Sequence, residues 1–308
     1  MHTRYGESFV FRPLFADSSV MIVETIMNKT NIQIQVLVEN TAAGKAILAE
    51  HGISFHIKTG GHSILFDTGQ GFVLSNNASI MNIDLRQVES IVLSHGHYDH
   101  CGGLRFFTDP DNTTRIYAHP AAFQPKFSKK PQNQIYPVGM AAVLGQHLPQ
   151  LQQRAAFTEE PTEIINGLWV TGQVPRVNDF EKSSGTFYLD QQGQQPDDLI
   201  DDQSMFFKTT QGIIVLLGCA HAGIINTLQY IQSLTGNIPF HYVIGGTHLL
   251  NASKQRMFQT IEQLHKLNVQ NIAPCHCTGL SARIDLHNAF QEQCTECKIG
   301  TSYNFELI

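Results

Sequence analysis

Short runs of branched apolar residues recur along the chain and predict a sheet. Residues 32–38 first alternate between apolar and polar side chains and then become continuously apolar, which predicts a strand whose later part is buried on both faces. Residues 53–57 and 63–67 flank a glycine turn at residues 59–61, so we expect them to form a hairpin. The apolar run at residues 91–93 predicts a further buried strand.

Strands and helices alternate in the last third of the chain. The pattern predicts two paired strands, a helix, a strand, a second helix and a last strand, at residues 205–208, 212–217, 224–234, 242–249, 254–267 and 271–279. The apolar strands lead to His221, His248 and His276. Core packing gives no reason to place imidazoles at the ends of successive strands, whereas a shared metal centre does.

The densest group of potential metal ligands follows the strand at residues 91–93. His95, His97, Asp99 and His100 fall within six consecutive positions, and zinc, iron and manganese all accept imidazole nitrogens and carboxylate oxygens. A single histidine is more often structural than a ligand, but packing does not explain this crowding. Because His95 and His97 can point to one side while Asp99 and His100 approach from another, the segment can supply parts of two adjacent metal sites.

The spacing His-x-His-x-Asp-His at residues 95–100 resembles the signature of the metallo-β-lactamase superfamily. The resemblance implies the α/β class and a four-layer αββα sandwich, with the metals between two β-sheets. It also implies one domain over residues 31–308, preceded by an extension or partner-covering arm at residues 1–30. Matched by order along the chain, the metal ligands that it implies are His95, His97, Asp99, His100, His221 and His276.

Three other residues near the implied site, Asp67, Cys219 and His248, each have more than one possible role. Asp67, in a Phe-Asp-Thr-Gly motif, is expected to orient a ligand imidazole, with an ordinary turn aspartate as the alternative. Cys219 stands where the superfamily often has a bridging aspartate; it either ligates a metal or packs in the core, and packing is favoured. His248 is placed in the site as a ligand, a substrate-binding group or a proton carrier. Asp99 and His248 are the candidate catalytic residues.

Residues 105–200 are poorer in regular pattern and rich in glutamine and proline. We expect a solvated, lid-like insertion there, which in this fold often covers the metal site; an exposed helix and loop is the alternative. Arg176 could hold a carboxylate or a phosphate through its planar guanidinium group. His51 and His56 are interpreted as structural.

Composition and charge limit the possible partners. The chain has 308 residues, 42% of them hydrophobic, which is enough for one large domain. A net charge of −6 offers no basic surface for nucleic acid or an anionic membrane. Without a signal-peptide pattern or a membrane-length apolar run, we expect a cytoplasmic protein. The six cysteines do not suggest a disulfide framework, and a zinc knot is a less favoured reading of Cys275, Cys277, Cys294 and Cys297.

These features predict a metal-dependent hydrolase. One or two divalent ions between the ligands would activate water for attack on an ester, phosphoester, lactone or amide. Zinc is the best-fitting ion, and Mn²⁺ and Fe²⁺ also suit the ligands. The expected partner is a small-molecule substrate, which can be anionic, and a homo-oligomeric assembly stays open.

Two other functions compete with the hydrolase. Residues 39–40, 50–54, 172–176, 218–224, 245–249 and 274–279 together resemble a branch of the superfamily named after a dihydropterin ribofuranosylaminobenzene phosphate synthase, which implies a transferase. A metal-binding sensor or regulatory protein without turnover is the other alternative. The acidic charge disfavours a ribonuclease, and His97 disfavours a diiron redox protein, because that group typically has glutamate at this position.

Overall fold

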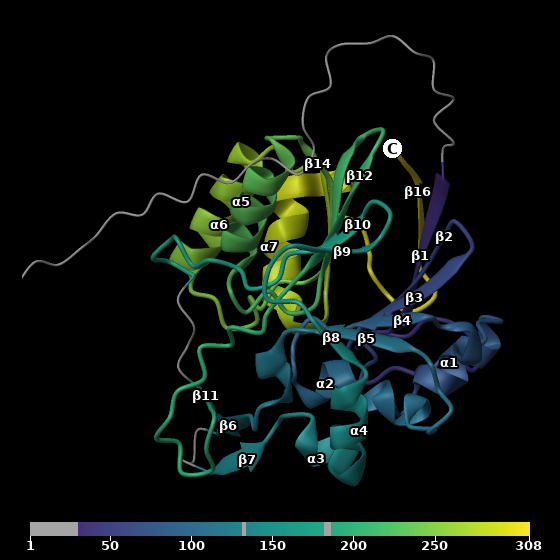
Figure 1. Cartoon of the computed structure of the whole chain (residues 1–308). Helices are drawn as coiled ribbons and strands as arrows, with labels where there is room; N and C mark the ends of the chain where they lie inside the picture. The colour runs from purple at the N-terminus through teal and green to yellow at the C-terminus, as the bar shows by residue number, and fades with distance from the viewer. Residues whose placement is uncertain (1–29, 131–133, 182–185) are drawn as a thin grey trace, which may run out of the picture.

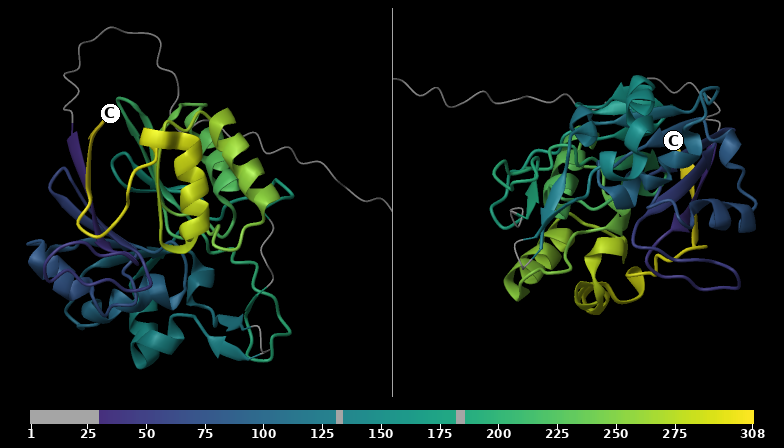
Figure 2. Two further views of the ribbon diagram at one scale, coloured as in Figure 1. Left: turned by 180° about the vertical axis from the view of Figure 1, so that it is seen from behind. Right: turned by 90° about the horizontal axis from the view of Figure 1, so that it is seen from below.

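The computed structural model describes residues 30–130, 134–181 and 186–308, which form four layers (Figure 1). Two halves of a folded-over sheet form the middle, and helices cover the outer face of each half (Figure 2). This is the αββα arrangement that the sequence implied. Apart from Thr30, the expected extension at residues 1–30 lies outside the described residues.

The main sheet has 13 strands in the described part of the chain. One half contains β1 (Thr30–Val38), β2 (Ser54–Thr59), β3 (His62–Phe66), β4 (Ser90–Val92), β5 (Arg115–Ala118) and β8 (Ala155–Phe157). The other half contains β9 (Thr162–Ile165), β10 (Leu168–Val170), β12 (Met205–Thr209), β13 (Gly212–Leu217), β14 (Phe240–Gly246) and β15 (Asn271–Cys275). Strand β16 (Ser302–Leu307) pairs with β1 and with β12, so it links the two halves.

The helices form two separate outer layers. One layer contains α1 (Leu74–Ile80), α2 (Tyr98–Cys101), α3 (Ala141–Leu144) and α4 (Leu148–Gln153). The other contains α5 (Ile224–Thr235), α6 (Lys254–Lys266) and α7 (Leu280–Phe290). Helices α5 and α6 and the hairpins β2–β3 and β12–β13 lie where the sequence pattern predicted them. None of the described helices is long and apolar enough to cross a membrane.

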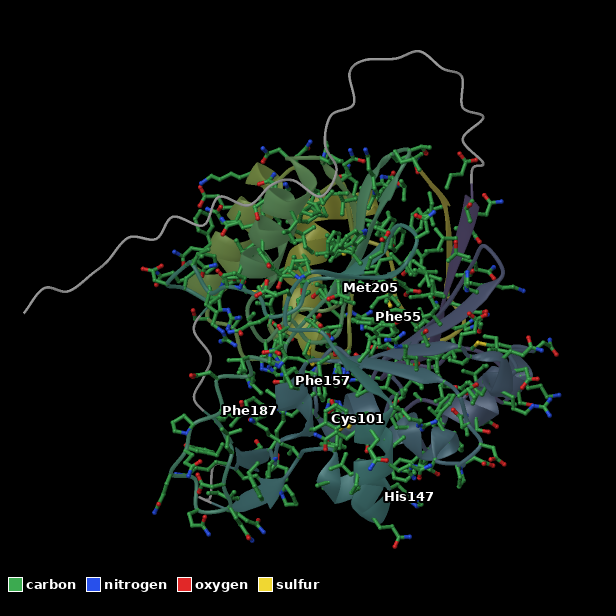
Figure 3. The ribbon with its side chains drawn as sticks, in the orientation of Figure 1. Phe55, Cys101, His147, Phe157, Phe187 and Met205 are labelled. Atoms are coloured by element: carbon green, nitrogen blue, oxygen red, sulfur yellow. The ribbon has the colours of Figure 1, made fainter. Side chains whose placement is uncertain are left out.

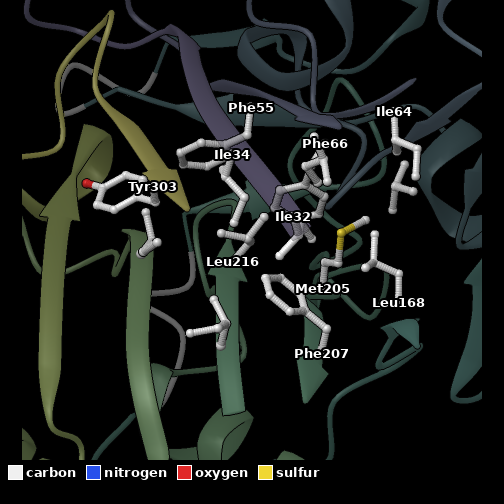
Figure 4. Close-up of a cluster of buried hydrophobic side chains, with 14 of the residues drawn as sticks. Ile32, Ile34, Phe55, Ile64, Phe66, Leu168, Met205, Phe207, Leu216 and Tyr303 are labelled. Atoms are coloured by element: carbon white, nitrogen blue, oxygen red, sulfur yellow. The ribbon is translucent and has the colours of Figure 1, made fainter. Parts of the chain in front are cut away.

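The core between the two sheet halves explains the pattern of β1. Ile34 of β1 belongs to the same buried cluster as Phe207 of β12 and Leu216 of β13 (Figure 4). The last residues of the strand, Leu37 and Val38, instead pack in the core under the α1–α4 layer. The later part of β1 is therefore buried on both faces, as its change from alternating to continuous apolar residues predicted.

Each outer helix layer covers a hydrophobic core of its own. Leu228 of α5 and Leu264 of α6 pack with Val215 of β13. On the other side, Leu151 of α4 packs with Ile91 of β4. Fully burying one such side chain stabilises the fold by roughly 1.5–3 kcal/mol, so these contacts hold the helices firmly on the sheet.

The region at residues 105–200 is only partly a separate insertion. Its strands β5, β8, β9 and β10 belong to the main sheet, so the solvated, lid-like character expected for the region does not extend to them. The apolar faces of these strands are short, which is why their pattern is weak in the sequence. The separate part is a three-stranded sheet made of β6 (Phe127–Lys129), β7 (Ile135–Pro137) and β11 (Phe187–Tyr188).

Parallel pairing places several strand ends at one edge of the molecule. Strands β13, β14 and β15 are parallel neighbours, and so are β3, β4 and β5. Ligands commonly bind beyond the carboxyl ends of parallel strands, because the loops that follow them meet there. The loops after β4, β13, β14 and β15 are therefore the places to search for a site.

His56 of β2 gives the fold a testable pH dependence. The side chain is buried with Nε2 2.9 Å from Ser63 Oγ, and burial, helped by the charge of Lys58, lowers its pKa to about 4. The unfolded chain binds this proton below pH 6.5 and the folded protein does not. The free energy of unfolding should therefore fall by roughly 2 kcal/mol as the pH drops from 6.5 to 4.

Denaturant titrations across this pH range test the prediction. His56→Gln should remove that part of the loss, and His147→Gln, which changes an exposed histidine, should keep it. An unchanged pH slope in His56→Gln would refute the assignment. Above pH 6.5 both variants should show the pH dependence of the parent protein.

Candidate metal centre

Side chains from four loops meet at the edge where the parallel strands end. The loops follow β4, β13, β14 and β15. Together they bring every predicted site residue into groups of potential metal ligands: His95, His97, Asp99, His100, His221, His248 and His276. Asp99 and His100 lie on the short helix α2, directly after the His-x-His segment.

His95, His97 and His221 form the first group. His95 Nε2 lies 2.9 Å from His97 Nδ1 and 3.2 Å from His221 Nε2. Nitrogens that bind a tetrahedral zinc ion at 2.0–2.1 Å lie about 3.3 Å from one another, which is close to these separations. The three buried rings therefore point their nitrogens at a common centre and fit one metal ion.

Asp99 is the centre of a second group. Its Oδ2 atom lies 3.1 Å from His51 Nε2, 3.4 Å from His276 Nε2 and 3.6 Å from His100 Nε2. His51 was interpreted as structural from the sequence, and the fold places it in a group of potential metal ligands with Asp99 and His276. The histidine comes from a loop distant in the sequence, so its position beside Asp99 becomes visible only in the fold.

Asp67 and Ser94 orient two of the rings. Asp67 Oδ2 lies 2.7 Å from His100 Nδ1, and it also accepts a 2.7 Å hydrogen bond from Ser94 Oγ. Because the Ser94 hydroxyl already donates to Asp67, it accepts from His95 Nδ1 at 2.9 Å. Both rings then keep the lone pair on Nε2 for a metal ion. This is the role that the sequence predicted for Asp67.

The ring of His276 is held from the opposite side. His276 Nδ1 lies 3.0 Å from Asn40 Oδ1, and its backbone N–H donates to Glu39 Oε1 at 2.8 Å. Its Nε2 atom is buried and has no hydrogen-bond partner in the described part of the chain. The nearest acid is Asp99, whose Oδ2 atom lies 3.4 Å away, and a cation held by both groups would satisfy this buried nitrogen.

The charge states of the rings suit metal binding. Burial lowers the pKa of His95 and His221 far below the usual value and that of His97 to about 3. These imidazoles are neutral at pH 7, which is the form that binds metals. Burial also opposes protonation of His100, but the carboxylates of Asp67 and Asp99 raise its pKa to about 9. A cation would displace the proton from His100.

Two cysteines lie inside the cluster. Cys219 Sγ is 3.2 Å from His100 Nε2, and Cys219 also groups with His276 and Cys277. Burial opposes ionisation of Cys277, but hydrogen bonds from Cys219 and His248 lower the pKa of its thiol. Cys219 therefore contacts predicted ligand atoms in addition to being packed, whereas the sequence analysis considered Cys277 only as part of the less favoured zinc knot.

The alternative zinc knot does not form. Cys277 faces the pocket, whereas Cys275 packs with Cys297 in the core between the sheet halves. Cys294 contacts a different core, the one under α5–α7. All four residues are described, and no group of potential metal ligands combines them. The reason is that β15 ends at Cys275, whereas Cys277 lies in the short turn after it, and the positive φ of His276 between them breaks the alternation of the strand.

The backbone at the site is unusual. Positive φ angles of 49–59° occur at Asp67, Ala220, His248 and His276. Residues other than glycine pay roughly 1–3 kcal/mol for such conformations, which gather at functional sites. Close packing adds a further constraint, because a Cβ atom at Gly218 would lie 2.1 Å from Ser94 Oγ. The fold therefore holds the ligand loops in conformations that they would not adopt alone.

An aspartate-rich segment holds two of these loops in place. Asp201 Oδ2 accepts a 2.8 Å hydrogen bond from the backbone N–H of Gly96, and its Oδ1 lies 2.9 Å from Lys126 Nζ. Asp202 Oδ2 accepts a 2.8 Å hydrogen bond from Ala222 N–H. Adjacent residues thus fix the loops after β4 and β13. The sequence analysis missed this support. The signal that could have revealed it is the group of four aspartates at positions 197, 198, 201 and 202.

A pocket of about 730 Å³ opens onto the cluster and is lined by Asp99, His221 and His276. The three-stranded sheet lines it as well, and the Phe187 ring of β11 lies 4.8 Å from the His97 ring (Figure 3). This sheet thus forms part of the pocket lining, and the expected covering of the metal site stays a prediction. Arg176 does not line this pocket, and its guanidinium group donates to the backbone carbonyl groups of Asp198 and Leu199. Its possible role in holding an anion stays a prediction.

Known proteins resemble this chain over most of its length. The profile of the Metallo-beta-lactamase superfamily matches residues 52–229. A Methanocaldococcus jannaschii protein named 7,8-dihydropterin-6-methyl-4-(beta-D-ribofuranosyl)-aminobenzene-5'-phosphate synthase is 30% identical over 287 residues, which cover 89% of this chain and 97% of that protein. An uncharacterized protein of the same organism is 32% identical over 251 residues, or 81% of this chain and 91% of that protein.

A solved structure described as a metal-dependent hydrolase of the beta-lactamase superfamily matches with a TM-score of 0.74 and 29% identity, over 88% of this chain and 98% of that chain. Zinc-bound PqqB from Methylobacterium extorquens has a TM-score of 0.51 and 12% identity, over 88% and 99% of the two chains, which supports the fold alone. These matches confirm both the fold and the branch that the sequence resembled. The chain belongs to the metallo-β-lactamase superfamily.

Proposed function

We propose that this protein is a metal-dependent hydrolase of small ester, phosphoester, lactone or amide substrates. The observation that carries the proposal is the pair of ligand groups, one around His95 and one around Asp99, at the wall of an open pocket. Membership of a superfamily with metal-dependent enzymes supports it. A purely structural metal site would be closed to solvent, whereas a catalytic one needs access.

The residues divide between two cation positions. His95, His97 and His221 would hold one ion, and Asp99, His100 and His276 the other, with Cys219 beside both groups. Imidazole, carboxylate and thiol donors fit zinc best, while Mn²⁺ and Fe²⁺ suit the imidazole and carboxylate donors. Bound ions would lower the pKa of a water molecule and offset negative charge that develops on the substrate.

Two side chains are suited to move protons. Asp99 is the carboxylate available for this, because both oxygens of Glu39, the other acid that lines the pocket, already accept backbone hydrogen bonds. His248 lines the same pocket, and its Nδ1 atom is buried without a partner among the described residues. We assign Asp99 as the acceptor of the proton of water and His248 as the donor to the leaving group.

The similarity to a protein named as a synthase favours a second candidate, a transferase. Such an enzyme would use the same metal centre but require a second organic substrate in place of water. Turnover of an ester with water as the only acceptor therefore distinguishes the hydrolase from the transferase. A hydrolase cleaves a single ester added to the protein, and a transferase leaves it intact until the acceptor is present.

Release of nitrophenol from bis(4-nitrophenyl) phosphate and 4-nitrophenyl acetate tests the proposal. We expect the metal-loaded protein to cleave at least one of them, to lose this activity with the chelator dipicolinate, and to regain it with added zinc. His147→Ala, which removes an exposed histidine far from the cluster, should behave like the parent protein. A fully metal-loaded protein that is inert to esters, phosphoesters, lactones and amides would contradict the hydrolase and leave the transferase and the sensor as the remaining functions.

A further inference from the structure

Two arginines line a second wall of the metal-site pocket. Arg256 comes from α6 and Arg283 from α7, and both belong to the lining that also includes His276 and Cys277. Both side chains are only partly exposed to solvent. A ligand in this pocket can therefore contact both the potential metal ligands and the two guanidinium groups.

Neither guanidinium group has a carboxylate partner within the described part of the chain. Arg256 Nε is buried and makes no hydrogen bond there. The acid within electrostatic range of Arg256 is Glu181, whose oxygens already accept from Asn178 Nδ2 and from the backbone at the start of α5. A partly buried arginine without an anion is costly, so Arg256 has unused capacity to bind one.

Arg283 is in a similar position. Glu296 lies within electrostatic range of it, but that carboxylate forms its ion pair with Lys298. The acids that line the pocket itself are Glu39 and Asp99, and both are engaged by the backbone or by the histidines. The wall formed by α6 and α7 therefore has positive charge that no described residue neutralises.

We propose that Arg256 and Arg283 bind a phosphate monoester group of the substrate. This inference deepens the proposed function: the phosphate is a non-reacting handle, and the bond to be cleaved lies at the ligand groups of His95 and Asp99. Guanidinium groups bind phosphate oxygens through charge-assisted and often paired hydrogen bonds.

The arrangement favours phosphate over carboxylate. Donors approach from two helices, and the first residues of α7, Gly279 and Leu280, line the same wall with the positive end of the helix dipole. A planar carboxylate is satisfied by a single guanidinium fork. A tetrahedral dianion can accept hydrogen bonds from several directions and carries the greater charge, so it makes better use of this wall.

Calorimetric titration of the metal-loaded protein with phenylphosphonate tests the proposal. This probe mimics a phosphate monoester, and its carbon–phosphorus bond resists hydrolysis. We expect Arg256→Gln and Arg283→Gln each to weaken binding roughly tenfold, because each removes a charge-assisted contact. Lys254→Gln, which removes an exposed positive charge from the same helix as Arg256, should change binding less than about twofold.

The results also separate this inference from the hydrolase proposal. If both arginine variants keep their folded spectra and metal content and bind phenylphosphonate like the parent, the metal ions alone hold the anion and the inference is wrong. Benzoate that binds as tightly as phenylphosphonate, with the same dependence on the arginines, would overturn the assignment to phosphate. Arginine-dependent binding in a protein without turnover would support the handle and contradict the hydrolase.

Discussion

Replacing Asp99 with asparagine is expected to lower kcat by roughly a thousandfold or more while the fold stays intact. The carboxylate faces imidazole nitrogens of His51, His100 and His276 at 3.1–3.6 Å. Asparagine keeps the shape but removes the negative charge, so it weakens the second cation position and cannot accept a proton from water. Loss of general base catalysis alone lowers rates by roughly 10²–10⁴-fold.

Steady-state kinetics with the nitrophenyl substrates, at saturating zinc, measure this effect. Asp285→Asn is a matched control, because it makes the same chemical change at an exposed position on α7. Its kcat should stay within about twofold of the parent value. Full turnover in a folded, metal-loaded Asp99→Asn protein would show that Asp99 neither holds a needed ion nor accepts a proton.

Replacing Lys126 with methionine is expected to destabilise the fold by about 3–5 kcal/mol. The ammonium group is buried and lies 2.9 Å from both Asp197 Oδ2 and Asp201 Oδ1. Without it, two carboxylates remain buried with no cation beside them. Because Asp201 also holds the backbone of Gly96, between two predicted ligands, the variant should bind metal more weakly as well.

Urea titrations measure the free energy of unfolding for this prediction. Lys129→Met, which changes an exposed lysine on β6, the strand that directly follows Lys126, should change it by less than about 0.5 kcal/mol. Adding Asp197→Asn and Asp201→Asn to Lys126→Met should recover part of the loss, because no uncompensated charge then remains buried. A Lys126→Met protein as stable as the parent would mean that this ion-pair network does not support the loop.

The central features of the site could be predicted because their signals are local. Four ligands in the six positions after an apolar strand, at His95 to His100, stand out without any knowledge of the fold. His221 and His276 were found because each follows a strand, and parallel strands share an edge. Asp67 was identified through a motif that the superfamily resemblance supplied.

The missed residues act through contacts between distant parts of the chain. Lys126 and Asp201 are 75 positions apart, and Asp201 and Gly96 are 105 apart. Each looks like an ordinary charged or small residue in its own segment. His51 and Cys277 likewise acquire their roles only when the loops meet. Arg176 shows the same limit, since a lone arginine after a strand does not reveal that it donates to the backbone carbonyl groups of Asp198 and Leu199.

The central claim is that residues from the ends of four strands hold one or two divalent cations. Mass spectrometry of the metal content tests it most directly, on protein purified without added metal and compared before and after the dipicolinate treatment. We predict one to two equivalents of zinc, manganese or iron per chain, lost with the chelator together with turnover. A folded protein that contains less than about 0.1 equivalent, and takes up no metal when zinc is added, would contradict the account.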